Sequence, residues 1–438
     1  MRIIQSVPSM YFMNFYMLVK AYLWIETGEQ MSDDKDILEF KRKSIQNDEE
    51  TKESNTDNKE FEKKLARHSR VKVYKVIIVI AVVVVVLGMA YSSYKNMVYT
   101  DYSIVNTIQY EDATGANFVG FNGNVLKYSR DGATAFNMSN DMLFNQTYEM
   151  QNPMVDTCGD YVALGDYKGT KIYILNSEGR QGEIDTTLSV QRFSVASNGN
   201  IAVVLEEDDV TWIRLYNKDG EIVASDRTTM KKSGFPLSID ISDNGIMINV
   251  SYLYIDSGKI SSSVAFYNFG SVGQNEIDNL VSGYNYDDET ITYVQFMNSS
   301  TAFALGNTQF SIFKGDQRPE RIFDLTLEDE IKSVFHNESY IGLVYDQTSA
   351  VEPYRIDVYN TSGDLVLSKP FSLEYTDVLF NKDFMIIYNA NECVIYDING
   401  KEKYNGLFKN SIITMVPGNN KTRYLFTSGS RTDEIQLK

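Results

Sequence analysis

Histidine, cysteine and tryptophan are scarce in this chain, with two of each among 438 residues. Beyond residue 100 the only histidine is His336, and this weighs against multi-histidine metal sites and several classes of hydrolase. Cys158 and Cys393 are the two cysteines, so disulfides do not hold so long a region together. From this composition we predict two free, mostly buried thiols and assign no catalytic residue, cofactor or metal ligand.

Positive charge is also in short supply. The chain has 41 Lys and Arg against 59 Asp and Glu, and the residues after 100 have 26 against 46, a net charge near −20. Such a surface repels the phosphate backbone of nucleic acids and anionic lipid headgroups. We therefore expect no nucleic-acid partner and interpret the excess acid as a solvated surface that aids solubility.

One long apolar run, VIIVIAVVVVVLGMAY (Val76–Tyr91), contains no charged or strongly polar side chain. Tyr74 and Tyr94 flank it with rings suited to a bilayer interface. At ~1.5 Å per residue, the helix between these rings would be about 30 Å long, the thickness of a bilayer core. We predict a single transmembrane helix over residues 73–95. A buried strand or a core helix of a soluble domain is the alternative, although strands rarely exceed about ten residues.

Basic residues are concentrated before this run. They are Lys63, Lys64, Arg67, Arg70, Lys72 and Lys75, whereas Lys95 alone follows closely. Because the more basic flank stays cytoplasmic, we expect a cytoplasmic N-terminus and an extracellular C-terminal region. Residues 31–72 have the composition of a disordered cytoplasmic tail. Residues 1–30 include the hydrophobic stretch Met10–Ile25, which fits either an over-extended start before Met31 or an interfacial helix.

From Tyr102 onward, short strand patterns alternate with polar turns, and one signature recurs: a strand, a turn begun by Asn or Asp, and a closing Gly. It occurs as YILNSEG (Tyr173–Gly179), RLYNKDG (Arg214–Gly220), DVYNTSG (Asp357–Gly363) and VIYDING (Val394–Gly400). Repeats of about 40 to 50 residues are typical of β-propeller blades. A β-sandwich pair or barrel array would not repeat one hairpin signature in this way.

The repeat predicts an all-β fold, an eight-bladed β-propeller over residues 101–438. Seven blades follow one another at 116–150, 151–187, 188–234, 235–284, 285–327, 328–373 and 374–410. The last stretch, 411–438, has only three strands, and Tyr102–Tyr110 would supply the fourth and close the ring. A seven-bladed propeller is the alternative.

In QNPMVDTCGDYVALGDYKGTKIYILNSEG (Gln151–Gly179), Ser263–Gly283 and Asp329–Asp346 the chain resembles a Gram-positive bacterial family of unknown function. Members of that family look like single-span membrane proteins with an extracellular PQQ-like or WD-like propeller. The resemblance implies no catalytic residues. Quinone-dependent propeller enzymes carry a tryptophan motif in every blade, whereas this region contains Trp212 alone.

The longest predicted loops join second to third strands, or one blade to the next, and these loops share one face of a propeller. Loops Tyr252–Lys259, Gln347–Pro353, Met230–Phe235 and Ser282–Glu289 are of these kinds. Their aromatic residues suit protein or peptide recognition. The candidate partner-binding residues are Phe235, Tyr252, Tyr254, Tyr284, Tyr286 and Tyr354. Asp287, Asp288 and Glu289 lack the ligand spacing of a calcium loop and read as a solvated acidic turn.

These patterns favour a non-enzymatic, membrane-anchored propeller that binds an extracellular protein or peptide as an envelope scaffold. A hydrolase that cleaves envelope glycans or peptides with carboxylates in the channel is the main alternative, and converging buried acids would favour it. A sensor that signals to the cytoplasmic tail is a third.

Overall fold

The computed structural model describes residues 74–92, 95–110, 115–139, 141–208, 210–228, 234–256, 258–418 and 420–438. The chain divides into two compact units, Met1–Asn96 and Met97–Lys438, each described by itself. The predictions for residues 1–30 and for the tail over 31–72 lie outside the described residues.

The first unit contributes one described helix, Tyr74–Ser92, with 19 residues and a mean hydropathy of 2.5. The helix includes the run of five valines, Val82–Val86. Because the backbone N–H and C=O groups of a helix hydrogen-bond to one another, such a segment exposes no unpaired backbone group to a bilayer. By length and composition, it is the one helix among the described residues that can cross a membrane.

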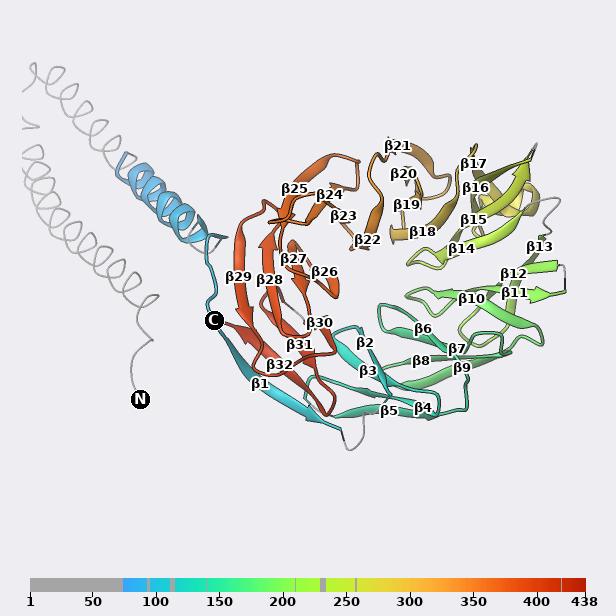
Figure 1. The fold of residues 1–438 in the computed structure, drawn as a ribbon, viewed down its shortest axis with the longest axis horizontal. Coiled ribbons are helices and arrows are strands. Elements are labelled where there is room, and N and C mark those ends of the chain that lie inside the picture. Colours follow the sequence, from blue (N-terminus) through green and yellow to red (C-terminus); the bar gives the residue numbers. More distant parts are fainter. Residues whose placement is uncertain are drawn as a thin grey trace, which may run out of the picture. The chain divides into compact units, whose positions relative to one another are not determined.

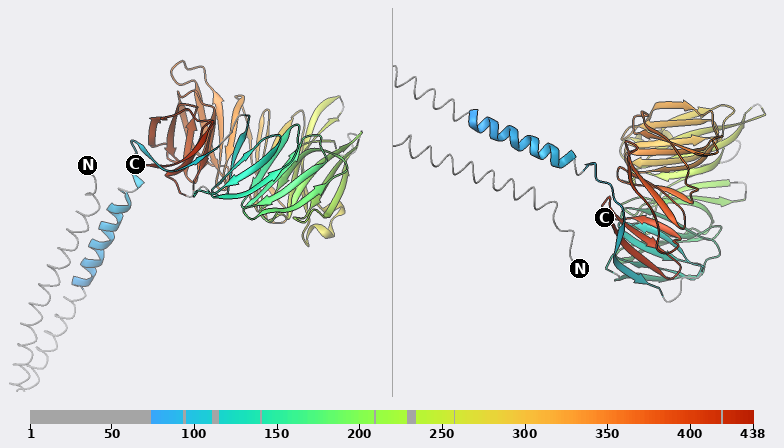
Figure 2. Two further views of the ribbon diagram at one scale, coloured as in Figure 1. Left: turned by 90° about the horizontal axis from the view of Figure 1, so that it is seen from below. Right: turned by 60° about the vertical axis from the view of Figure 1, so that its left-hand side comes forward.

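The second unit consists of eight four-stranded antiparallel sheets arranged as blades around a central axis (Figure 1), with two further views in Figure 2. The eight-bladed prediction is therefore confirmed, and the seven-bladed alternative is wrong. The hydrophobic core lies between neighbouring sheets, where residues such as Ile248, Val250 and Ala202 pack blade against blade.

In blades one to four the strands run in chain order from the inner to the outer edge. They are β2 (Asn117–Phe121), β3 (Asn124–Tyr128), β4 (Gly132–Phe136), β5 (Met142–Thr147); β6 (Pro153–Cys158), β7 (Tyr161–Asp166), β8 (Lys171–Asn176), β9 (Gly179–Asp185); β10 (Ser189–Val195), β11 (Ile201–Glu207), β12 (Val210–Tyr216), β13 (Ile222–Thr228); β14 (Phe235–Ile241), β15 (Met247–Asp256), β16 (Lys259–Asn268), β17 (Leu280–Tyr286). Two 3₁₀ turns, η1 (Gly273–Asn275) and η2 (Ile277–Asn279), lie between β16 and β17.

Blades five to seven repeat this order. Their strands are β18 (Ile291–Asn298), β19 (Thr301–Gly306), β20 (Gln309–Lys314), β21 (Glu320–Thr326); β22 (Ile331–His336), β23 (Tyr340–Asp346), β24 (Tyr354–Asn360), β25 (Leu365–Phe371); β26 (Asp377–Asn381), β27 (Phe384–Tyr388), β28 (Glu392–Asp397), β29 (Glu402–Leu407).

The eighth blade closes the ring with strands from both ends of the unit. Here β30 (Thr414–Pro417), β31 (Arg423–Thr427) and β32 (Arg431–Leu437) are completed by β1 (Tyr102–Gln109). The register places Tyr102 opposite Leu437 and Gln109 opposite Arg431. This pairing is the predicted closure, and it leaves β32 without a free edge.

The recurring turn works as the sequence predicts. The side chain of its first residue accepts a backbone N–H two positions later: Asn176 from Glu178 (2.9 Å), Asn217 from Asp219 (3.0 Å), Asn360 from Ser362 (2.9 Å) and Asp397 from Asn399 (3.0 Å). Each closing glycine has a positive φ, 84° at Gly220 and 87° at Gly363 for example, which other residues rarely adopt.

Side-chain amides fix which turns share a face. Asparagines in the turn between first and second strands donate to the same turn of the next blade: Asn122 to Asp160 (3.2 Å), Asn198 to Asn244 (3.0 Å), Asn298 to Glu338 (3.1 Å), Asn337 to Lys382 (2.6 Å) and Asn381 to Asn420 (2.9 Å). We call this side the first-turn face, and Tyr102 begins β1 there. The second–third turns and the links between blades lie on the opposite side, the second-turn face.

Candidate functional site

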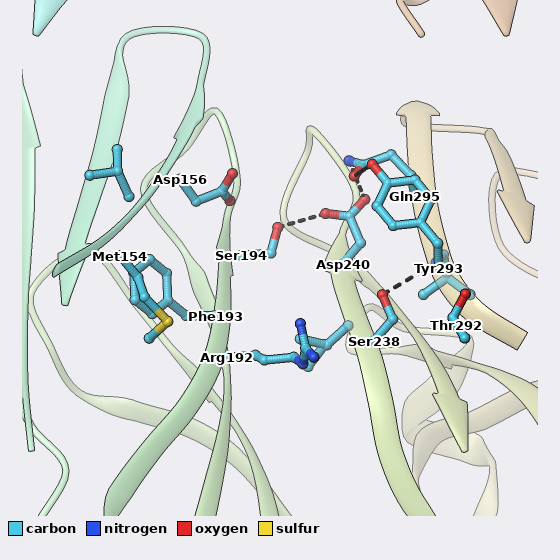
Figure 3. A pocket seen from close by; sticks show the side chains of 13 residues that line it. Met154, Asp156, Arg192, Phe193, Ser194, Ser238, Asp240, Thr292, Tyr293 and Gln295 are labelled. Carbon is cyan, nitrogen blue, oxygen red and sulfur yellow. Dashed lines mark hydrogen bonds between the residues drawn. The ribbon is translucent and has the colours of Figure 1, made fainter. Parts of the chain in front are cut away.

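Hydrogen-bonded polar side chains line the channel at equivalent positions of four consecutive inner strands. The positions are Asp156 on β6, Ser194 on β10, Asp240 on β14 and Gln295 on β18. Figure 3 shows Ser194 between Asp156 and Asp240, with Gln295 on the far side of Asp240. We call these four residues the polar girdle.

Both oxygens of Asp240 are occupied by protein donors. Oδ1 accepts the Ser194 hydroxyl at 2.6 Å, and Oδ2 accepts the Gln295 amide at 2.9 Å and the Phe296 N–H at 2.5 Å. Asp156 likewise accepts the Val195 N–H at 2.7 Å. Each carboxyl therefore joins its own blade to the next.

Burial raises the pKa of both carboxyls. The pKa of Asp240 rises to about 8, because desolvation and the nearby charge of Asp156 outweigh its hydrogen bonds. The pKa of Asp156 is also raised, again mainly by burial. Burial thus favours the protonated, neutral form of Asp240.

A pocket of about 260 Å³ lies against the girdle (Figure 3). Three of the strands that line it, β10, β14 and β18, shift register at the same level, before Arg192, Ser238 and Tyr293 respectively. Such bulges re-aim the following side chains. Tyr293 donates a 2.9 Å hydrogen bond to Gln295, and Ser238 accepts the Val294 N–H at 3.2 Å.

Three of the six predicted partner-binding residues are buried. Tyr252 shares a 2.8 Å hydrogen bond with Tyr267 inside the core, Tyr286 donates to Ser311 at 2.9 Å, and Tyr354 packs on Phe371. These rings stabilise blades four to six. The strands β15 and β17 also extend through much of the predicted loops Tyr252–Lys259 and Ser282–Glu289.

Phe235, Tyr254 and Tyr284 are half-buried. The hydroxyl of Tyr284 donates to the Pro319 carbonyl at 2.8 Å, which ties it to blade five. Phe235 and Tyr254 lie at the second-turn ends of β14 and β15. Recognition through these residues stays a prediction.

The most exposed apolar residues of this region were missed from the sequence. Ile255 and Ile260 face each other directly across β15 and β16 and are 70% and 54% exposed. Val351, in the loop between β23 and β24, is 79% exposed. The sequence did contain a signal for this pair, because Ile255 and Ile260 flank the turn at Gly258. If the two strands stay paired up to the turn, these residues become cross-strand neighbours.

The acidic turn over Asp287–Glu289 is only partly solvated. Asp287 and Asp288 are exposed, and Asp288 pairs with Lys259 at 2.7 Å. Glu289, in contrast, is buried and accepts the N–H groups of Asn307 (2.7 Å) and Thr308 (3.1 Å). The prediction of a solvated turn was thus wrong for Glu289. Among the described residues, no three His, Cys, Asp or Glu side chains are grouped to hold a metal.

The chain is, then, an all-β, eight-bladed propeller whose channel wall is joined by buried carboxyls. It belongs to the family of unknown function DUF5711, whose model matches residues 95–437. The resemblance drawn from the Gln151–Gly179 motif is thereby confirmed. A comparison with curated proteins finds no match.

Several solved structures have a similar fold. BamB from Moraxella catarrhalis is 11% identical, with a TM-score of 0.46 over 77% of this chain and 100% of that one. The Dos1 propeller is 10% identical, with a TM-score of 0.49 over 79% and 97%. Hsv2p from Kluyveromyces lactis is 9% identical, with a TM-score of 0.43 over 72% and 99%. At sequence identities this low, the similarity concerns the fold alone and says nothing about function.

Proposed function

We propose that this protein is a membrane-anchored extracellular propeller that binds a protein or peptide through its second-turn face. The observation that carries the proposal is the apolar tip of the β15–β16 hairpin. Ile255 and Ile260 are cross-strand neighbours, so their side chains lie on the same face of the hairpin. Paired, exposed isoleucines on a hairpin offer an apolar contact that a binding partner can bury.

The anchor is supported by the apolar helix Tyr74–Ser92 and by the basic residues that precede it. Because cationic flanks stay cytoplasmic, the propeller would lie outside. The chain joins the propeller at Tyr102, on the first-turn face. Ile255 and Ile260 lie on the opposite, second-turn face.

The hydrogen bonds of Asp240 weigh against the alternative of a carboxylate hydrolase. A hydrolase needs carboxyls that present free oxygens to a substrate. Both oxygens of Asp240 accept hydrogen bonds from Ser194, Gln295 and the Phe296 backbone. This geometry supports a role for Asp240 in joining blades.

Site-specific photocrosslinking in native membranes tests the proposal. A photoreactive residue at position 255 should give a discrete crosslinked product, and Ile260→Asp should abolish it. The matched control is position 222, since Ile222 is 55% exposed but lies at the first-turn end of β13. Equal products at 222 and 255, or none at 255, would contradict the proposed surface. Proteinase K added to protoplasts should digest the region beyond residue 95, and full protection would contradict the orientation.

A further inference from the structure

We infer that the channel pocket binds a small organic carboxylate through the guanidinium of Arg192. This inference concerns a second site and does not depend on the hairpin tip. Arg192 lies on β10 directly after the register shift that separates it from Val190, so the bulge sets its direction. In Figure 3 it is drawn among the lining side chains, below Ser194 and to the left of Ser238.

Arg192 is the available cation of the pocket. Thirteen residues line the cavity, and Arg192 is the one Lys or Arg among them. Its side chain is exposed, and it forms no ion pair within the part of the chain that the structure describes. A planar guanidinium with free N–H groups matches the two oxygens of a carboxylate.

The pocket also offers contacts for the part of such a ligand that lies beyond its carboxylate. Met154 and Phe193 provide apolar surface, and the hydroxyls of Ser238 and Thr292 provide polar contacts. A volume of about 260 Å³ is much larger than a single water needs. A ligand with one carboxylate and a small apolar or ring body fits these features.

Charge distinguishes a carboxylate from a phosphate. A phosphate carries up to two negative charges and is usually held by several donors or cations. Here one guanidinium shares the pocket lining with two acids, Asp156 and Asp240, in a domain with a net charge near −20. A singly charged anion is the better match. Asp240 is largely neutral below about pH 8, so it repels the ligand little at neutral pH.

The full-length protein in detergent can be tested with 4-fluorobenzoate, whose binding is followed by ¹⁹F NMR. One charge-assisted contact to a ligand of this size predicts a Kd of about 1–10 mM. Arg192→Gln should weaken binding at least tenfold. Arg192→Lys should weaken it less, because lysine keeps the charge but cannot donate two parallel hydrogen bonds to a carboxylate. Arg130→Gln, at an exposed arginine outside the pocket, should leave binding unchanged.

Three comparisons make the test decisive. The neutral 4-fluorobenzamide should bind at least tenfold more weakly than 4-fluorobenzoate; equal affinity would overturn the inference. Inorganic phosphate should compete poorly, and tighter phosphate binding would overturn the assignment to carboxylates.

Binding of 4-fluorobenzoate should weaken above pH 8, where Asp240 ionises beside Asp156 and Tyr293, and Asp240→Asn should flatten this dependence. Unaltered circular dichroism of each variant excludes misfolding, and unchanged affinity in folded Arg192→Gln would also overturn the inference.

Discussion

Ser194 donates a 2.6 Å hydrogen bond to Asp240, and the two residues occupy equivalent positions on the inner strands of blades three and four. The bond crosses the boundary between blades near the channel axis, where Asp240 is 5% exposed. Asp240 also holds the Phe296 N–H of blade five. One carboxyl thus couples three consecutive blades, and removing it should affect the propeller more than an ordinary surface change.

Asp240 should make stability depend on pH. Its pKa is about 8 in the folded chain, against about 3.9 when unfolded. The folded state therefore binds the extra proton between these values, so the free energy of unfolding falls as pH rises through this window. The loss due to Asp240 should reach at most about 1.4 kcal/mol per pH unit. Denaturant unfolding of the wild type and Asp240→Asn at pH 5, 6, 7 and 8 measures it.

Asp240→Asn keeps the shape of the side chain but cannot ionise, so its stability should fall less steeply over this range. The exposed Asp316→Asn serves as the control and should follow the wild type. Parallel pH profiles for the wild type and Asp240→Asn would show that Asp240 is already ionised in the folded protein.

Glu289 should be a stabilising residue despite its acidic neighbours. Its carboxylate accepts the backbone N–H groups of Asn307 and Thr308, besides the Thr308 hydroxyl, and so fixes the second–third turn of blade five. Glu289→Ala removes the buried, charged acceptor of these hydrogen bonds, and we expect it to lower the free energy of unfolding by about 2–3 kcal/mol. Asp287→Ala, at an exposed neighbour, should change it by less than about 0.5 kcal/mol. Similar losses in the two variants would contradict this role.

The propeller and its closure could be predicted because local signals repeat. Asn217 and Gly220, like Asn360 and Gly363, specify a turn through interactions only a few residues long. Once blades are counted, the lone strand at Tyr102–Tyr110 has one place to pair. The channel site could not be predicted in the same way, because Ser194 and Asp240 lie 46 residues apart and only the blade register brings them together.

The six aromatic candidates show a second feature that the sequence did not reveal. Tyr252 and Tyr286 were predicted to lie in recognition loops, but each lies in a strand. Their hydroxyls point toward buried partners, Tyr267 and Ser311 respectively. Sequence alone did not show which face of the strand each ring occupies, since this depends on where pairing ends. The exposed pair Ile255 and Ile260 follows from the same pairing.

The two cysteines should react slowly in the native protein. Both are free thiols, Cys158 half-buried and Cys393 buried, as predicted. Burial and the neighbouring Asp243 raise the pKa of Cys158 to about 12, and burial raises that of Cys393. At pH 8 only about one Cys158 in ten thousand would be a thiolate, the reactive form. Mass spectrometry after iodoacetamide treatment should find both unmodified unless the chain is unfolded first. A cysteine at exposed position 316 should label quickly, and equally fast labelling of Cys158 would contradict this.

The closing strand should decide whether the propeller folds as a soluble unit. A fragment of residues 97–438 keeps β1, whose register with β32 runs from Tyr102–Leu437 to Gln109–Arg431. A fragment of residues 111–438 lacks β1, exposes the edge of β32 and uncovers Phe426, on which the Tyr102 ring packs at 5.6 Å. Unpaired edges recruit other chains, so we expect the shorter fragment to aggregate or to unfold at a clearly lower denaturant concentration. Size-exclusion chromatography and denaturant unfolding of both fragments measure this. Two monomers of equal stability would show that β1 is dispensable and that the ring is held by the contacts between β2 and β30 alone.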